Sequence, residues 1–146
     1  EHEARGARIV LEVCQRLRIP NEYRVLAERT ARFHLHYHRA LELKPSTMVK
    51  TLEQLDAFRK PERFEKFLLA SEADARGRPG YENAVFPQGD YFRQAFSAAR
   101  DIDIAALREQ GFENMKLANK IKEVRTSAVA AIKEKFLSDT EQTGQA

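Results

Sequence analysis

Residues 31–59, ARFHLHYHRALELKPSTMVKTLEQLDAFR, decide the fold because they contain two segments with helical periodicity on either side of a proline. At about 100° per residue, Phe33 and Tyr37 share one face of the first helix, and His34 lies within that face. The second helix is expected to begin near Pro45, since proline is favoured in a first helical turn. It should continue to the end of the quoted stretch, which predicts a pair of consecutive helices.

Polar residues on these helices matter only where the fold buries them. Asp56 projects onto the apolar face of the second helix, and a buried carboxylate needs a partner because an unpaired charge there costs several kcal/mol or titrates to neutral. Arg59, three residues later, offers an ordinary ion pair. His34 faces inward, His36 is predicted to point away, and His38 lies at the edge of the apolar face.

Residues 1–18 predict an earlier helix, and His2 projects onto its apolar face. His2, His34 and Asp56 would therefore point into one core from three successive helices, and imidazole and carboxylate groups are usual ligands of divalent metals. Taken singly, each is explained as well by a hydrogen-bonded core group. The apolar face of the first helix consists of Ile9, Val10, Val13 and Leu17.

The remaining periodic segments are also helical, so the predicted fold is an all-α helical bundle of roughly six to eight helices. Asp74 projects about 20° from Phe67 at helical periodicity, which makes it a second semi-buried carboxylate candidate. We expect three regions, namely a domain portion over 1–78, a helical region over 79–137 and a disordered polar tail over 138–146. The further helical segments are 61–76, 90–99, 102–108 and 113–136.

Composition restricts the class of protein. The 146 residues are 42% hydrophobic and 32% charged, which is enough apolar material for one ordinary domain with a core. A single cysteine, Cys14, excludes an intramolecular disulfide. No apolar run approaches the roughly 20 residues of a membrane span, so we expect a cytoplasmic protein without membrane contact. The net charge of +3 suits an anionic partner without proving one.

The terminal helical segment carries cations opposite an apolar face. Lys116 and Lys120 are four residues apart and therefore neighbours, and Arg125 lies further along. These three side chains are candidate contacts to the phosphates of RNA. The alternative is an ordinary solvated face of an amphipathic helix.

Several motifs together resemble one family, the bacterial multifunctional CCA proteins, which are tRNA nucleotidyltransferases with an appended HD-type phosphohydrolase domain. The resemblance covers nearly the whole chain, and it fits the carboxy-terminal part of such a protein, with part of the HD domain followed by a helical tail. The motifs are HEARGA (2–7), FH (33–34) with HR (38–39), ELKP (42–45), LDAFRKP (55–61) and SEADARGR (71–78).

The resemblance implies a parent enzyme that adds C, C and A to tRNA with CTP, ATP and magnesium. It further implies an HD site, loaded with nickel or another transition metal, that acts as 2′,3′-cyclic phosphodiesterase, 2′-nucleotidase and phosphatase. His2, His34 and Asp56 match its later metal ligands, with Asp74 in reserve. His34 and Asp56 would be catalytic, and His34 could instead donate a hydrogen bond to phosphate.

The chain departs from the HD pattern because no His-Asp doublet occurs in it. We therefore expect a fragment that is inactive alone, with few metal ligands and weak RNA binding, while homodimerisation stays open. One alternative is a non-catalytic helical module that binds RNA or protein and whose histidines are structural. Another is an intact small hydrolase with unusual ligands.

Overall fold

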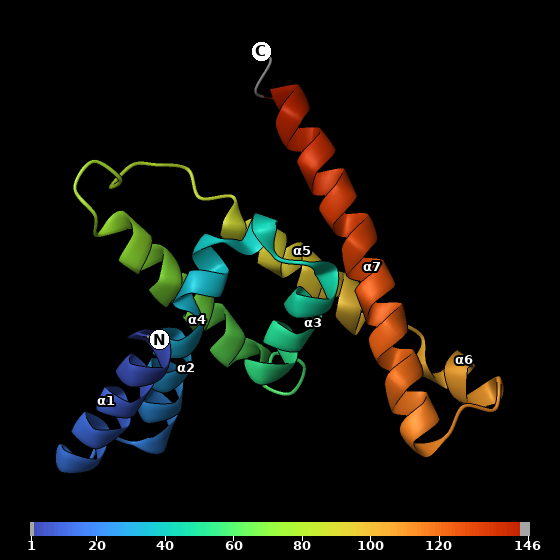
Figure 1. Ribbon diagram of the computed structural model, residues 1–146, viewed down its shortest axis with the longest axis horizontal. Helices are drawn as coiled ribbons and strands as arrows, with labels where there is room; N and C mark the ends of the chain where they lie inside the picture. The colour runs from blue at the N-terminus through green and yellow to red at the C-terminus, as the bar shows by residue number, and fades with distance from the viewer. Residues whose placement is uncertain (1, 144–146) are drawn as a thin grey trace.

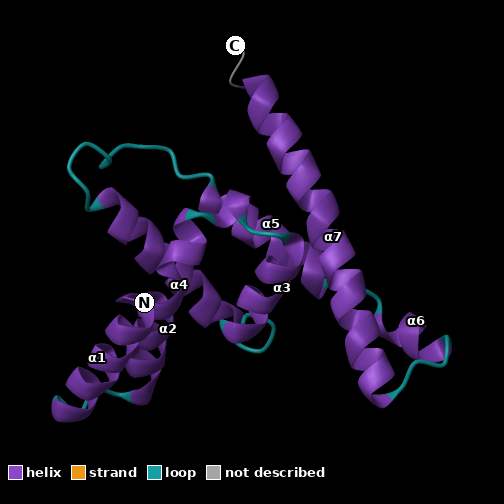
Figure 2. Cartoon of the chain, viewed as in Figure 1, coloured by secondary structure: helices purple, strands orange, loops and turns teal. Residues whose placement is uncertain are grey.

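The computed structural model describes the backbone of residues 2–143 and the side chains of residues 3–139. Throughout this part of the chain the regular structure is helical and strands are absent (Figure 2), so the all-α prediction is confirmed. The elements in chain order are α1 (His2–Arg16), α2 (Asn21–His38), the 3-10 helix η1 (Ala40–Glu42), α3 (Pro45–Gln54), α4 (Pro61–Arg76), α5 (Gln88–Arg100), α6 (Ile104–Glu109) and α7 (Asn114–Thr143).

The helices form a central group with a projection at each end (Figure 1). Helices α1 and α2 lie side by side as a hairpin at one end, and α2 continues into contact with α4 and α5. The long helix α7 crosses the opposite side, where it packs against α5 and α3 and carries the short α6 beside its beginning. None of the described helices is long and apolar enough to cross a membrane.

The core lies where α2, α3, α4 and α5 meet, and aromatic rings fill much of it. Tyr37 of α2 stacks on Phe92 of α5 with ring centroids 6.1 Å apart, and Phe64 of α4 lies 5.1 Å from Phe96. Val129 adds the buried contact from α7. Because rings of this size remove large apolar areas from water, they fix how these helices cross and thereby where the polar residues around them lie.

The end of α3 differs from the prediction, because the helix stops at Gln54 instead of continuing to Arg59. The backbone N–H of Ala57 donates to Leu52 O at 3.0 Å, and the N–H of Asp56 donates to Glu53 O at 2.9 Å. This pair of bonds is a Schellman motif, with Asp56 at the left-handed position (φ 59°) that glycine usually occupies. Asp56 therefore leaves the helix, and its carboxylate does not follow the projection drawn from helical spacing.

The predicted apolar face of α1 is wrong in part. Among the described side chains of this helix Ala7 and Cys14 are buried, whereas Ile9 is 48% exposed and Leu17, just past the helix end, is 59% exposed. The reason is packing, because α1 contacts mainly α2. A single neighbouring helix covers only a narrow stripe of residues three or four positions apart, so the rest of the apolar face stays exposed. The side chain of His2 lies outside the described residues, so its predicted inward position stays a prediction.

The polar residues expected to form a disordered tail from position 138 are helical as far as Thr143, because α7 continues through them. Helix α7 is held along its length, since Phe136 packs against Tyr91 with ring centroids 5.4 Å apart and Lys133 Nζ donates to Leu43 O at 2.8 Å. These two contacts fix α7 at positions 133 and 136. The helix can continue beyond its last packed residue, because extending an existing helix by one turn costs less free energy than starting a new one. Residues 144–146 are outside the described part of the chain.

Candidate functional site

Asp56 is bound by two arginines. Arg59 Nε donates to Oδ1 at 2.6 Å, Arg59 NH2 donates to Oδ2 at 3.2 Å, and Arg63 NH2 donates to the same Oδ2 at 2.8 Å. The Asp56 side chain is only 14% exposed. The predicted pairing with Arg59 is therefore present, and Arg63 of α4 adds a partner that sequence spacing did not indicate.

The surroundings of Asp56 are cationic. The hydrogen bond from Arg59, together with the positive charges of Arg59, Arg29 and Arg63, holds the pKa of this carboxyl below its usual value, although partial burial opposes the shift. Burial lowers the pKa of Arg29, and the charge of Arg63 lowers it further. Two guanidinium groups bond this carboxylate and the charge of a third, Arg29, also acts on it, so this part of the surface attracts anions and repels free cations.

A second polar group joins α2 to α4. His38 Nε2 lies 2.8 Å from Asp74 Oδ2, and the rings of His34 and His38 meet edge to face with centroids 5.9 Å apart. His34 Nδ1 donates to the backbone oxygen of Ala31 at 3.0 Å. His34 and Asp74 also line a shallow groove of about 610 Å³ with otherwise mainly apolar walls. Asp74, the reserve carboxylate, is therefore the one that lies with the histidines.

The polar side chains considered for a metal are engaged with other partners in the described chain. Among the residues that the structure describes, no three His, Cys, Asp or Glu side chains form a group able to hold a metal ion. Asp56 is engaged by arginines, Asp74 is paired with His38, and His34 Nδ1 is used within its own helix. Asp56 bonds arginines instead of a metal ligand group, and the contribution of His2 lies outside the described residues, so the predicted set of His2, His34 and Asp56 stays a prediction. Metal binding by this chain stays a prediction.

His36, predicted to point away from the core, instead contacts α3. Its Nδ1 lies 2.9 Å from Thr51 Oγ1, and the Thr51 hydroxyl donates to Thr47 O at 2.9 Å. The single hydroxyl proton of Thr51 is thereby used, so Thr51 accepts and His36 Nδ1 carries the proton in the neutral ring. Burial lowers the pKa of His36. This histidine is a structural link between α2 and α3.

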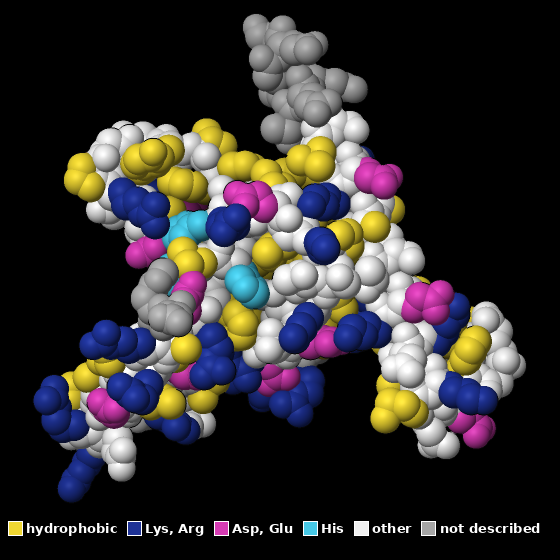
Figure 3. All heavy atoms as spheres, viewed as in Figure 1, with side chains coloured by type: hydrophobic (Ala, Val, Ile, Leu, Met, Phe, Trp, Pro, Cys, Tyr) yellow, Lys and Arg dark blue, Asp and Glu magenta, His cyan; other side chains and the backbone are white. Residues whose placement is uncertain are grey.

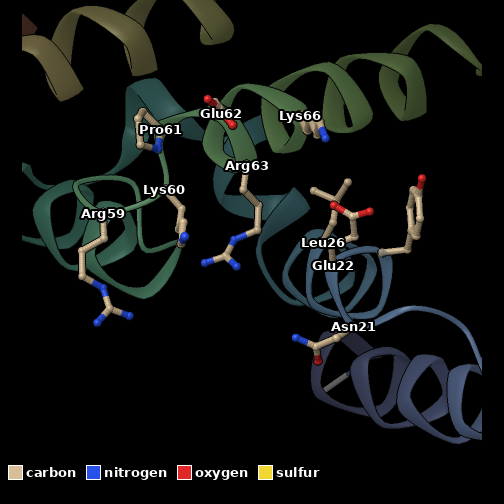
Figure 4. Close-up of a pocket in the computed structure, with 10 residues that line it drawn as sticks. Asn21, Glu22, Leu26, Arg59, Lys60, Pro61, Glu62, Arg63 and Lys66 are labelled. Carbon is tan, nitrogen blue, oxygen red and sulfur yellow. The ribbon is translucent and has the colours of Figure 1, made fainter.

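A pocket of about 590 Å³ opens beside the two arginines that bond Asp56, between the beginning of α2 and the beginning of α4 (Figure 4). We call it the basic pocket. In Figure 3, Lys and Arg side chains are also frequent over the α1–α2 end of the visible face. The sequence motifs do not predict this pocket, although the run RKPER (59–63) at a helix start is a usable signal. Its lining consists of Asn21, Glu22, Tyr23, Leu26, Arg59, Lys60, Pro61, Glu62, Arg63 and Lys66.

The three RNA-binding candidates on α7 differ in accessibility. Lys116 is exposed, and Lys120 is half-buried with Nζ 2.9 Å from Glu123 Oε1. Arg125 faces the protein instead, because its guanidinium lies 3.8 Å from the centroid of the Phe58 ring and its Nε donates to Ala99 O at 3.1 Å. The prediction that Arg125 contacts RNA conflicts with this packing. The role of Lys116 and Lys120 stays a prediction.

Comparisons with known proteins give a consistent answer. The chain is 47% identical over 137 residues to the multifunctional CCA protein of Alcanivorax borkumensis, which covers 94% of this chain and 33% of that protein. It is 43% identical over 133 residues to the protein of the same name in Pseudomonas fluorescens, which covers 91% of this chain. For Nitrosococcus oceani the identity is 46% over 128 residues, or 88% of this chain.

The other two comparisons add no relative, since no family model matches and no solved structure matches. The chain spans about a third of the length of the curated relatives that it matches. The identity of 43–47% extends over about nine-tenths of the chain, so it cannot come from one short motif. The resemblance inferred from the motifs is therefore confirmed, and the chain is similar to one third of a multifunctional CCA protein.

Proposed function

We propose that this chain is the carboxy-terminal third of a CCA-adding tRNA nucleotidyltransferase and that it helps to hold tRNA during maturation and repair of the 3′ end. The observation that carries this proposal is the identity of 43–47% to multifunctional CCA proteins along nearly the whole chain. Nucleotide addition with CTP, ATP and magnesium then belongs to the part of the relatives that this chain does not match.

The distribution of charge supports a role in RNA contact. RNA binding that does not read sequence rests on Lys and Arg side chains placed beside phosphates. Lys116 is exposed near the beginning of α7, and the basic pocket brings four further cationic side chains to another part of the surface. We expect weak binding with little preference between tRNA and other structured RNA, since cations along a helix contact backbones without reading bases.

We further propose that the parent carries an HD-type phosphohydrolase activity which this chain does not perform alone. The metal of such a site would polarise a phosphate and lower the pKa of a bound water. The described donors are committed to other partners, because Asp56 lies among arginines and Asp74 is paired with His38. Hydrolysis would need residues beyond those described.

Binding of labelled tRNA at low salt tests the proposal. Fluorescence anisotropy should show binding by the chain, and unlabelled tRNA or an unrelated structured RNA of equal length should compete about equally. A DNA duplex of similar charge controls for attraction to any polyanion. Absence of tRNA binding at low salt would remove the proposed role.

A protein-interaction module is the second candidate, favoured by the exposed apolar residues of α1. Ile9 and Val13 lie on one side of that helix, Leu17 follows its end, and all three stay accessible in the described chain. Sedimentation across a range of concentrations distinguishes self-association through this surface from a monomer. Val13→Glu should abolish any dimer that uses it, and a dimer indifferent to Val13→Glu would use another surface.

A further inference from the structure

The basic pocket has the shape and charge of a ligand site. Its volume of about 590 Å³ lies within the range of roughly 300–1,000 Å³ typical of small-molecule pockets. Arg59, Lys60, Arg63 and Lys66 line it together with two carboxylates, Glu22 and Glu62. In Figure 4 the side chains of Lys60 and Arg63 extend side by side from the beginning of α4, toward the side where α2 begins. The lining therefore carries an excess of positive charge.

The charge behind the pocket does not cancel this excess. Asp56 neutralises one charge, but Arg59 and Arg63 both bond to it and Arg29 adds a third guanidinium nearby. Within the described chain, Arg63 Nε and Arg29 NH1 are buried and lack hydrogen-bond partners. A buried donor left without a partner is unfavourable because it has lost its hydrogen bonds to water. An anion beside Arg63 would supply both an acceptor and a countercharge.

Two helix starts support the same polarity. The first turns of α2 (Asn21–Tyr23) and α4 (Pro61–Arg63) both line the pocket. Neither Pro20 nor Lys60, the residue before each helix, provides a capping side-chain hydrogen bond. In α4, Pro61 has no N–H and the N–H of Arg63 already donates to Lys60 O at 3.1 Å, so α2 supplies more of the free donors. The amino end of a helix carries partial positive charge that favours an anion. This contribution adds to the four cationic side chains and would not suffice without them.

The donors also indicate which anion fits. Arginine offers a planar pair of N–H donors that suits phosphate oxygens, and lysine adds a point charge. A pocket of this volume accepts an anion with a nucleoside attached, whereas a metal cation would meet net positive charge. Binding of an RNA backbone here rests on the proposed tRNA-binding role of the chain, whereas binding of a mononucleotide does not. We infer that the basic pocket binds a phosphate group, presented either by a nucleoside monophosphate or by an RNA backbone.

Nuclear magnetic resonance titrations test the inference at constant ionic strength, with chloride replaced by the probe. Inorganic phosphate, adenosine monophosphate and an RNA hairpin are the three probes. Each probe that uses the pocket should shift the amide signals of residues 21–23, 60 and 62–66. Inorganic phosphate and adenosine monophosphate should leave α7 signals unchanged at subsaturating levels, whereas the hairpin can shift α7 as well through Lys116 and Lys120. Circular dichroism melting confirms that every variant is folded.

Three variants separate pocket binding from general attraction. Lys60→Ala/Lys66→Ala removes two positive charges from the pocket and should weaken phosphate binding at least about tenfold, which corresponds to about 1.4 kcal/mol. Arg63→Lys keeps the charge but removes the paired donors, so it should weaken binding by a smaller factor. Lys135→Ala removes an exposed lysine of α7, outside the pocket, and should bind as the original chain does.

The probes distinguish the two sources of phosphate. Tighter binding of adenosine monophosphate than of inorganic phosphate, lost in Lys60→Ala/Lys66→Ala, supports a nucleotide ligand. Binding of the hairpin that these substitutions weaken, with little affinity for the mononucleotide, supports a backbone phosphate. The inference is overturned if no probe shifts residues 60–66, or if Lys60→Ala/Lys66→Ala and Lys135→Ala bind all three probes alike.

Discussion

Asp56 and Arg63 join the end of α3 to the beginning of α4, with Arg63 NH2 donating to Asp56 Oδ2 at 2.8 Å. The backbone of the same aspartate takes part, because the N–H of Lys60 donates to Asp56 O at 2.8 Å. One residue therefore ends a helix, holds the turn and orients an arginine that lines the basic pocket. The geometry of that pocket depends on this aspartate.

The two ion pairs of Asp56 should differ in strength. Arg63 is 22% exposed and Arg59 is 81% exposed, and exposed pairs are weak because solvent screens them. Double-mutant cycles with Asp56→Asn, measured by urea unfolding, should give a coupling of about 1–2 kcal/mol with Arg63→Met and below about 0.5 kcal/mol with Arg59→Met. Asparagine tolerates the left-handed backbone, so the cycle reports charge and not backbone strain. Equal couplings would contradict this account.

The stability of the chain should depend on pH through His36. Burial lowers the pKa of His36 below 6.5, while nearby Glu3 acts in the opposite direction. The unfolded chain therefore binds a proton at this site more readily than the folded chain, and the free energy of unfolding should fall as pH decreases below about 6.5. Urea unfolding at pH 7 and pH 5 should show a smaller loss for His36→Gln, which does not titrate. The same loss in both chains would exclude His36 as the cause.

Arg125 should be important for stability and not for RNA contact. Its guanidinium covers the ring of Phe58 and its Nε bonds to Ala99 O. Arg125→Ala should lower the free energy of unfolding by about 2 kcal/mol, from lost packing, cation–π attraction and one hydrogen bond. Lys122→Ala, at an exposed neighbouring position, should change it by less than about 0.5 kcal/mol. A stable Arg125→Ala chain with weakened RNA binding would reverse these assignments.

Divalent metals should have little effect on this chain. A ligand at one hundred times its Kd stabilises a protein by about 2.7 kcal/mol, so a tight site would raise Tm clearly in millimolar Ni²⁺ or Mg²⁺. We expect no such rise and no turnover of a 2′,3′-cyclic nucleotide, because Asp56 is bonded to Arg63 and Asp74 to His38. Cyclic phosphodiesterase activity that Asp56→Ala abolishes would contradict the expectation.

The sequence predicts the helices well because each depends on local periodicity. Helix α4 begins at Pro61 and ends at Arg76 as the spacing and Gly77 indicated. The end of α3 could not be placed, because the left-handed residue there is an aspartate and carries none of the usual glycine signal. The extent of burial on α1 was also missed, since periodicity marks an apolar face without telling how many neighbours cover it.

The candidate site was less predictable because its partners come from distant segments. His38 and Asp74 are 36 residues apart, and nothing local in the sequence pairs them. The sequence indicates that Asp56 needs a partner and that Arg59 is close enough to provide one. Whether Asp56 binds arginine or a metal depends on where α4 places Arg63, which the sequence does not show. The basic pocket likewise joins the starts of two helices that only tertiary packing brings together.

The salt dependence of tRNA binding tests most directly whether this chain holds RNA through its charges. The logarithm of affinity should fall linearly with the logarithm of salt concentration, with a slope of about one unit for each phosphate neutralised. Lys116→Ala/Lys120→Ala should lower that slope by up to about two units, with Lys116 contributing more because Lys120 already pairs with Glu123. Identical slopes for the original chain and this variant would mean that α7 presents only a solvated face.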